Sequence, residues 1–278
     1  MTNPTVSPPT LSVVSRDAHG HKRWRRHGDY KFAADQAAVP LVGLEAGRAA
    51  ISMPIGFLKV GEAYSLVALL GLQAGRNLFV APDGRWLSGY VPAVIRTYPF
   101  RMINDGSGGT ILGVVEDERF IGEDIDGERF FEGDEGNTPS AALKAVVEML
   151  QPMAPAAQAT AAAAALLAKH GLLAPWEIPV AGREAPLVLA GVFKINEAAL
   201  NILPAQALKA VRDGGALALA YAQLVSQQHI ALLGSLAEAH AAVAARAAAA
   251  ASQLVSPRGE LDLEFLNRNE VLDFRGLT

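Results

Sequence analysis

The chain has 278 residues, of which 51% are hydrophobic and 19% are charged; this excludes a disordered chain and is enough for a full hydrophobic core. The formal net charge of −4 argues against nucleic acid as a partner, because neutralising phosphates requires a basic face. There is no cysteine, so disulfides, thiolate nucleophiles and Cys-based zinc sites are excluded.

Residues 1–26 are predicted to form a flexible N-terminal arm. Residues 1–15 are rich in Pro, Ser and Thr, which is typical of a disordered tail. The basic run HGHKRWRRHGDYKF at residues 19–32 is interpreted as solvated, with a phosphate or anionic-lipid contact as the alternative. We find no secretory h-region and no charge-free apolar stretch long enough for a membrane helix. We therefore expect a soluble, cytoplasmic protein and leave association with the cell envelope open.

Residues 38–131 have the pattern of a sheet. Short apolar segments alternate with Gly, Pro and Asp-Gly: AVPLVGL, AAISMPIGFLKV, YSLVALLGL and NLFVAPDGRWLSGYV. This spacing is typical of strands and turns. Asp83-Gly84 predicts a tight turn that pairs residues 78–80 with residues 85–90 as a hairpin. Residues 110–117 predict a further strand.

Beyond residue 138 the apolar residues recur at the helical period. Thr138 is predicted to cap a helix with Pro139 at its first position, covering SAALKAVVEML. An alanine-rich helix follows, and Gly171 is predicted to end it.

The rest of the chain predicts one more strand and several helices. Residues 185–195 predict a strand, and Asn196 is predicted to cap a short helix. Pro204 is predicted to begin another helix, and residues 216–255 predict one long helix. The C-terminal string GELDLEFLNRNEVLDF predicts a short strand or an extended arm.

The order of these elements favours an α+β fold, with a sheet-rich N-terminal half and hairpins packed against a helix-rich C-terminal half. It disfavours the alternating βαβ pattern of nucleotide-binding folds. The strand at residues 187–195 could return to the first sheet and join the halves. We expect a flexible arm over residues 1–26, an α+β domain over 27–233, and an Ala-rich helical extension with a C-terminal arm over 234–278.

Sequence motifs for catalysis are weak. Ser226 and His229 lie three residues apart on a predicted helix, but a catalytic triad also needs an acid and an oxyanion hole. The acidic segment 116–135 lacks the spacing of an EF-hand, so a solvated loop is favoured over a cation site. We predict no catalytic residue and no cofactor. The alternative is a metal-dependent enzyme that uses Glu116, Asp117 and Glu123 with a distant histidine.

The densest aromatic cluster follows the Asp83-Gly84 turn. Tyr and Trp side chains offer a large contact area with a polar group, and Arg stacks on them, so such residues dominate binding hot spots. The alternative is core packing around the corner formed by Pro92 and Pro99. The candidate binding residues are Trp86, Tyr90, Arg96, Tyr98, Phe100 and Arg101.

Several strings resemble one bacterial family, named SapC after a surface-layer-associated gene product. They are DYKFA, VPLVGLEAGRAAISMPIGF, ALLGLQAGRNLFVAPDGRWLSGYVPAVIRTYPF, GVFKINEAALNILPAQALKAVRDGGALALAYAQLVSQQHIALL and, near the C-terminus, LDLEFLNRNEVLDF. The first four lie between His27 and Leu233. The resemblance implies no catalytic residue, and it suggests an accessory role in a surface layer, in export, or in uptake and peptide modification.

These observations predict a non-enzymatic accessory protein that binds a peptide or a protein partner through the aromatic and arginine residues named above. A third interpretation is a structural subunit in which the Ala-rich helix pairs between copies, which would make the protein a homo-oligomer.

Overall fold

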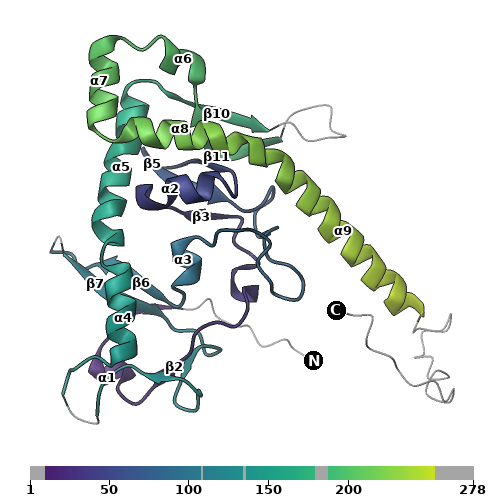
Figure 1. Cartoon of the computed structure of the whole chain (residues 1–278). Helices are drawn as coiled ribbons and strands as arrows, with labels where there is room; N and C mark the ends of the chain where they lie inside the picture. The colour runs from purple at the N-terminus through teal and green to yellow at the C-terminus, as the bar shows by residue number, and fades with distance from the viewer. Residues whose placement is uncertain (1–9, 108, 134–135, 179–186, 254–278) are drawn as a thin grey trace. The chain divides into compact units, whose positions relative to one another are not determined.

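The computed structural model describes residues 10–107, 109–133, 136–178 and 187–253 (Figure 1). The chain divides into two compact units, Met1–Gly234 and Ser235–Thr278. The fold is α+β, with strands mainly in the N-terminal half and helices mainly in the C-terminal half, as predicted. The arm or strand predicted near the C-terminus lies outside the described residues.

The first unit contains a five-stranded antiparallel sheet. The β4–β5 hairpin turns at Gly61, whose φ of +61° is a conformation that favours glycine. Strand β11 pairs with β4, so Val192 lies opposite Leu58; the late strand therefore returns to the first sheet. Strand β10 was not predicted. The strands, in sheet order, are β10 (Leu173–Ile178), β11 (Leu187–Ile195), β4 (Ile55–Val60), β5 (Ala63–Leu69) and β3 (Ala38–Pro40).

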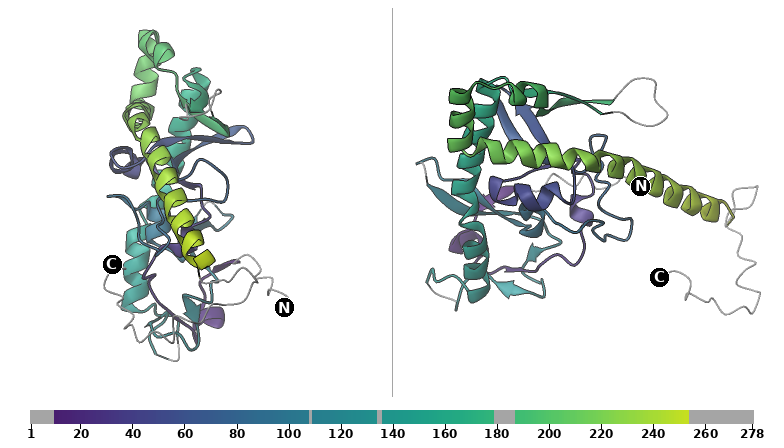
Figure 2. Two further views of the ribbon diagram at one scale, coloured as in Figure 1. Left: turned by 90° about the vertical axis from the view of Figure 1, so that its right-hand side faces the viewer. Right: turned by 45° about the horizontal axis from the view of Figure 1, so that its top comes forward.

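Three helices pack on one another and on this sheet, namely α2 (Gly43–Ala50), α5 (Met153–Lys169) and α8 (Ala216–Ser226) (Figures 1 and 2). Buried side chains of α8 fasten it to two strands. The Ile55 N–H donates to Ser226 Oγ at 3.1 Å, and the Ile195 N–H donates to Gln223 Oε1 at 2.9 Å. Helix α2 corrects the expectation of sheet over residues 43–50, because its buried alanines recur with helical spacing.

A second sheet has the order β1–β7–β6 and is also antiparallel. Its strands are β1 (Leu11–Val13), β7 (Thr110–Val115) and β6 (Phe100–Asn104). A small third sheet has the order β8 (Ile121–Gly122), β2 (Arg23–Trp24) and β9 (Glu128–Arg129). Strand β7 confirms the strand predicted at residues 110–117.

Residues 10–26 are folded in the structure, which differs from the flexible arm that we expected. Strand β1 pairs with β7, and β2 pairs with both β8 and β9. Trp24 is buried, with its ring edge-on to Phe100 at 4.7 Å. The basic run lies against the acidic segment: Lys22 forms an ion pair with Glu116 at 3.1 Å. The two segments of opposite charge thus order one another. Because they lie far apart in the sequence, residue spacing does not predict this pairing.

The predicted turn and helix boundaries have mixed outcomes. Gly84 has a φ of +95° and Val80 bridges to Trp86, which confirms the hairpin turn. The cap of α4 (Ala141–Leu150) is Ser140 rather than Thr138, because the Ser140 hydroxyl accepts from the Leu143 N–H. The remaining helices are α1 (Arg16–His19), η1 (Lys31–Ala33), α3 (Ala93–Arg96), α6 (Glu197–Asn201), α7 (Ala205–Asp213), η2 (Gln227–His229) and α9 (Ile230–Gln253).

The helical run Ala216–Ala249 is the candidate membrane span in the described part of the chain. Its mean hydropathy is 1.2 in an 18-residue window, of which 6% is buried. Length and composition alone do not distinguish a membrane helix from a helix of a soluble protein.

Candidate functional site

The six candidate binding residues do not form one exposed surface. Tyr90, Tyr98 and Phe100 are buried, with exposed fractions of 9%, 7% and 1%. Trp86 is half-buried, Arg96 is exposed, and Arg101 is half-buried. The candidate aromatic residues near the two prolines therefore belong largely to the core, which was the alternative interpretation.

The two buried tyrosines each donate a hydrogen bond to a carboxylate. The Tyr90 hydroxyl lies 2.7 Å from Glu45 Oε1, and the Tyr98 hydroxyl lies 2.7 Å from Asp117 Oδ2. Burial and the hydrogen bond to Glu45 raise the pKa of Tyr90 to about 12. Burial and the hydrogen bond to Asp117 likewise raise the pKa of Tyr98. Both hydroxyls therefore remain protonated donors at neutral pH and hold the fold together.

Glu116, a candidate metal ligand, is occupied by protein groups. Its Oε1 atom accepts a 2.6 Å hydrogen bond from Ser12 and lies 2.8 Å from His19 Nε2, and its Oε2 atom pairs with Lys22. Burial alone would raise the pKa of Glu116, but the hydrogen bonds from Ser12, His19 and Lys22 outweigh it and lower the pKa. This carboxylate anchors the N-terminal segment.

Asp117 and Glu123 have different surroundings. Burial would raise the pKa of Asp117, but two hydrogen bonds from Arg119, at 2.9 and 2.7 Å, and one from Tyr98 lower it. The Glu123 side chain is 72% exposed and lies 3.6 Å from His21. Among the described residues, no group of three or more His, Asp or Glu side chains is placed to hold a metal. Nothing in this region favours the metal-dependent enzyme.

Ser226 and His229 are not arranged as a nucleophile and base. Ser226 is fully buried, and its hydroxyl accepts from Ile55 N–H and donates to the Gln223 carbonyl at 2.7 Å. His229 Nε2 is buried without a hydrogen-bond partner in the described structure. The pair therefore has a structural setting.

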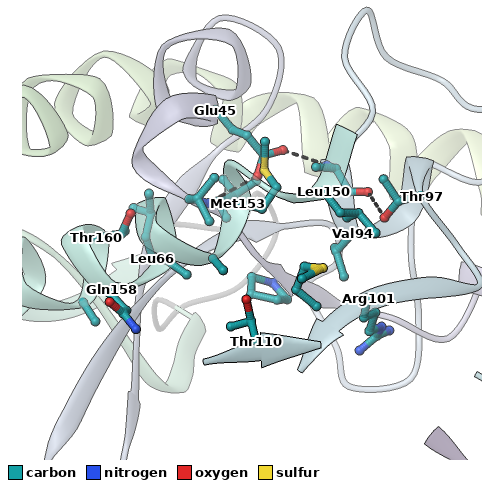
Figure 3. Close-up of a pocket in the computed structure, with 18 of the residues that line it drawn as sticks. Glu45, Leu66, Val94, Thr97, Arg101, Thr110, Leu150, Met153, Gln158 and Thr160 are labelled. Carbon is teal, nitrogen blue, oxygen red and sulfur yellow. Dashed lines mark hydrogen bonds between the residues drawn. The ribbon is translucent and has the colours of Figure 1, made fainter. Parts of the chain in front are cut away.

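The candidate functional site is a groove of about 460 Å³, here called the apolar groove (Figure 3). It lies among α2, α3, β3, β5, β6 and the α4–α5 junction. Its volume is in the range of small-ligand pockets. Figure 3 shows the side chains of Val94, Leu150 and Met153 gathered around it. Large apolar side chains that line it are Leu41, Val42, Leu66, Val94, Phe100, Met102, Leu150 and Met153, and α5 adds Ala154, Ala157 and Ala161.

The polar groups of the groove are used by the fold or uncharged, except for the half-buried Arg101, whose Nε has no hydrogen-bond partner in the described structure. Glu45 accepts from Tyr90, and the Thr97 hydroxyl donates to the Ala93 carbonyl at 2.8 Å. Thr160 Oγ1 accepts from the Gly43 N–H at 2.7 Å. The exposed polar residues at its rim are Ser65, Asn104, Thr110 and Gln158. The groove thus offers apolar contact, neutral polar side chains at its rim, one arginine and no nucleophile–base pair.

A second hollow of about 380 Å³ lies beside the second sheet. Arg101 and Arg119 line it together with Leu11, Tyr98 and Val115. Arg119 is paired with Asp117, and the buried Nε of Arg101 has no hydrogen-bond partner in the described structure.

Sequence reasoning identified Phe100 and Arg101, which line the apolar groove, but it missed the groove itself. Its walls come from residues 40–66, 93–110 and 150–161. The one local signal was the run of small alanines in α5, which leaves room beside the helix.

The family model described as SapC matches residues 14–233 of the chain. No curated protein and no solved structure matches the chain.

Proposed function

The chain belongs to the SapC family, and from this membership and the groove we propose that it is a non-enzymatic binding protein for an apolar segment of a peptide or protein. The apolar groove, with its largely apolar lining, is the observation that supports the proposal. The proposed binding surface is the groove and not the aromatic cluster, because Tyr90, Tyr98 and Phe100 are buried.

The chemistry of the groove favours binding over catalysis. Its buried carboxylate, Glu45, is held by three donors: the Tyr90 hydroxyl and the N–H groups of Ala93 and Val42. Apolar contact with methionine and alanine walls tolerates varied apolar side chains. The accessory role in a surface layer, in export or in uptake is part of this proposal, and the family name is its basis.

The test uses a library of random twelve-residue peptides displayed on phage and selected on the full chain. Selected peptides, made synthetically with a fluorophore, are expected to be rich in apolar residues. Ala157→Trp fills the groove from α5 and should weaken their binding at least tenfold, measured by fluorescence anisotropy. Ala159→Trp is the matched control, since Ala159 is also exposed on α5 and does not line the groove.

Two outcomes contradict the proposal: a selection without binders, or binding that Ala157→Trp leaves unchanged in a folded protein. Trp86→Ala and Arg96→Ala test whether the partner binds instead at the aromatic cluster predicted from the sequence. If only these two variants weaken binding, the partner is held outside the groove.

A further inference from the structure

The backbone of β6 has one side directed toward β7 and one side directed away from it. The Val115 N–H donates to the Pro99 carbonyl at 2.9 Å, and the Asp105 N–H donates to the Gly109 carbonyl at 3.1 Å. Because ladder bonds in an antiparallel pair alternate along each strand, Arg101 and Ile103 also bond to β7. The N–H and C=O groups of the even-numbered residues point away from it.

These outward groups are largely unpaired. Strand β6 is the outermost strand of its sheet. At the start of β6, the outward backbone groups of Phe100 are paired within the protein. Its N–H donates to the Thr97 carbonyl, and its carbonyl accepts from Thr97 Oγ1. Within the described residues, the backbone N–H and C=O groups of Met102 and Asn104 have no hydrogen-bond partner.

This open edge borders the apolar groove. Four of the five residues of β6 line the groove, including the successive residues Phe100, Arg101 and Met102, whereas β7 contributes only Thr110. Successive residues of a strand point to opposite faces, so it is the edge of β6, and not one face of its sheet, that lies along the groove.

The strand edge across the groove is blocked. Strand β3 is also the outermost strand of its sheet and ends at Pro40, which lines the groove. Proline has no N–H and is found on edge strands, where it prevents pairing with a further strand. Strand β6 has no proline from Phe100 to Asn104. The groove therefore has one edge that can accept a strand and one edge that ends in proline.

We propose that an extended peptide pairs with the edge of β6 at Met102 and Asn104 and becomes a fourth strand of the second sheet. This inference rests on the proposed function and specifies its binding mode and partner. Main-chain hydrogen bonds provide affinity, and pockets for alternate side chains provide specificity. The partner is an extended segment with apolar residues at every second position, which enter the groove beside Leu150 and Met153.

The test uses the tightest peptide from the phage selection, with the wild-type protein. The peptide is synthesised with a single N-methyl group at each backbone nitrogen in turn. Strand pairing predicts that methylation at every second nitrogen of the paired stretch weakens binding at least tenfold, while the intervening positions tolerate it. Amide exchange measured by NMR should slow at least tenfold at Met102 and Asn104 when the peptide is bound. Arg101 and Ile103, already bonded to β7, should change little.

Variants of the protein provide a second test. Met102→Pro removes the outward N–H and should weaken binding at least tenfold more than Met102→Ala, which keeps it. Val13→Pro makes the same change on the far edge of the sheet, where β1 is outermost, and should leave binding unchanged. If Met102→Pro fails to fold, the methylation scan on the wild-type protein still decides.

The two proposals fail in different ways. Suppose that Ala157→Trp weakens binding of the peptide, but the methylation scan shows no alternation and Met102 and Asn104 gain no protection. This result would overturn strand pairing and leave the groove as the binding site. A peptide that is insensitive to Ala157→Trp would overturn the proposed function itself.

Discussion

Glu45 Oε1 accepts 2.7 Å hydrogen bonds from both the Tyr90 hydroxyl and the Ala93 N–H, and so joins α2 to the start of α3 across 48 positions of sequence. Its second oxygen accepts from the Val42 N–H at 3.2 Å. Glu45 is 5% exposed. This buried carboxylate therefore holds α2 and α3, which form two walls of the apolar groove. Its loss should lower the free energy of unfolding.

Glu45→Ala is expected to lower the free energy of unfolding by about 2–4 kcal/mol, because buried donors lose their acceptor. Tyr90→Phe removes one of the three donors and should cost about 1–2 kcal/mol, since the carboxylate keeps its two backbone partners. Urea unfolding followed by circular dichroism measures both. Tyr221→Phe, at a residue that is 55% exposed, should change nothing. A Glu45→Ala protein as stable as wild type would show that this network is not a structural anchor.

The phenol of Tyr90 should ionise late. Its pKa is raised to about 12 by burial and by the hydrogen bond to Glu45, so it should stay protonated at pH 10.5 in the folded protein. Phenolate absorbance at 295 nm, compared between folded and guanidinium-unfolded protein, measures this. Tyr90→Phe should leave the folded-state absorbance at pH 10.5 unchanged and reduce that of the unfolded chain. A loss of signal in the folded state at that pH would contradict the assignment.

Stability should fall in acid because of Glu116 and Asp117. Both pKa values are lowered in the folded state, so both carboxylates stabilise the fold above their unfolded pKa values, near 4.5 and 3.8. That stability is lost as the pH decreases through the folded values, because the unfolded chain then binds more protons. Urea unfolding between pH 7 and pH 3 should show the decline.

The double variant Glu116→Gln, Asp117→Asn is less stable at pH 7 and should lose less on acidification than wild type. Glu123→Gln is the control, since that side chain is 72% exposed. Equal slopes for the double variant and wild type would assign the acid sensitivity to other groups.

A chain ending at Gly234 should retain the stability of the first unit. The unit boundary lies between Gly234 and Ser235, so the truncation removes the second unit whole, and the midpoint of urea unfolding should change little.

Light scattering on the same two proteins tests the proposal that the Ala-rich helix pairs between copies. That proposal requires an oligomer for the full chain and a monomer after truncation; the same number of subunits per particle in both proteins would exclude it.

The amino-acid sequence by itself determined the features that depend on near neighbours. Helix periodicity, the Asn196 cap and the Asp83-Gly84 turn involve residues within a few positions of one another, so their chemistry is visible in the string. The α+β class followed from the order of such elements, and the family resemblance from strings long enough to be specific.

Only the tertiary structure decided which of these residues are buried and which are available. His19 meets Glu116 across 97 positions and the N-terminal segment becomes ordered, and Tyr90 meets Glu45 and leaves the surface. The apolar groove exists because three distant stretches of chain meet around the small alanines of α5 and the edge of β6. Burial and strand edges depend on such long-range pairings. The spacing of residues within one segment does not indicate which distant segment packs against it.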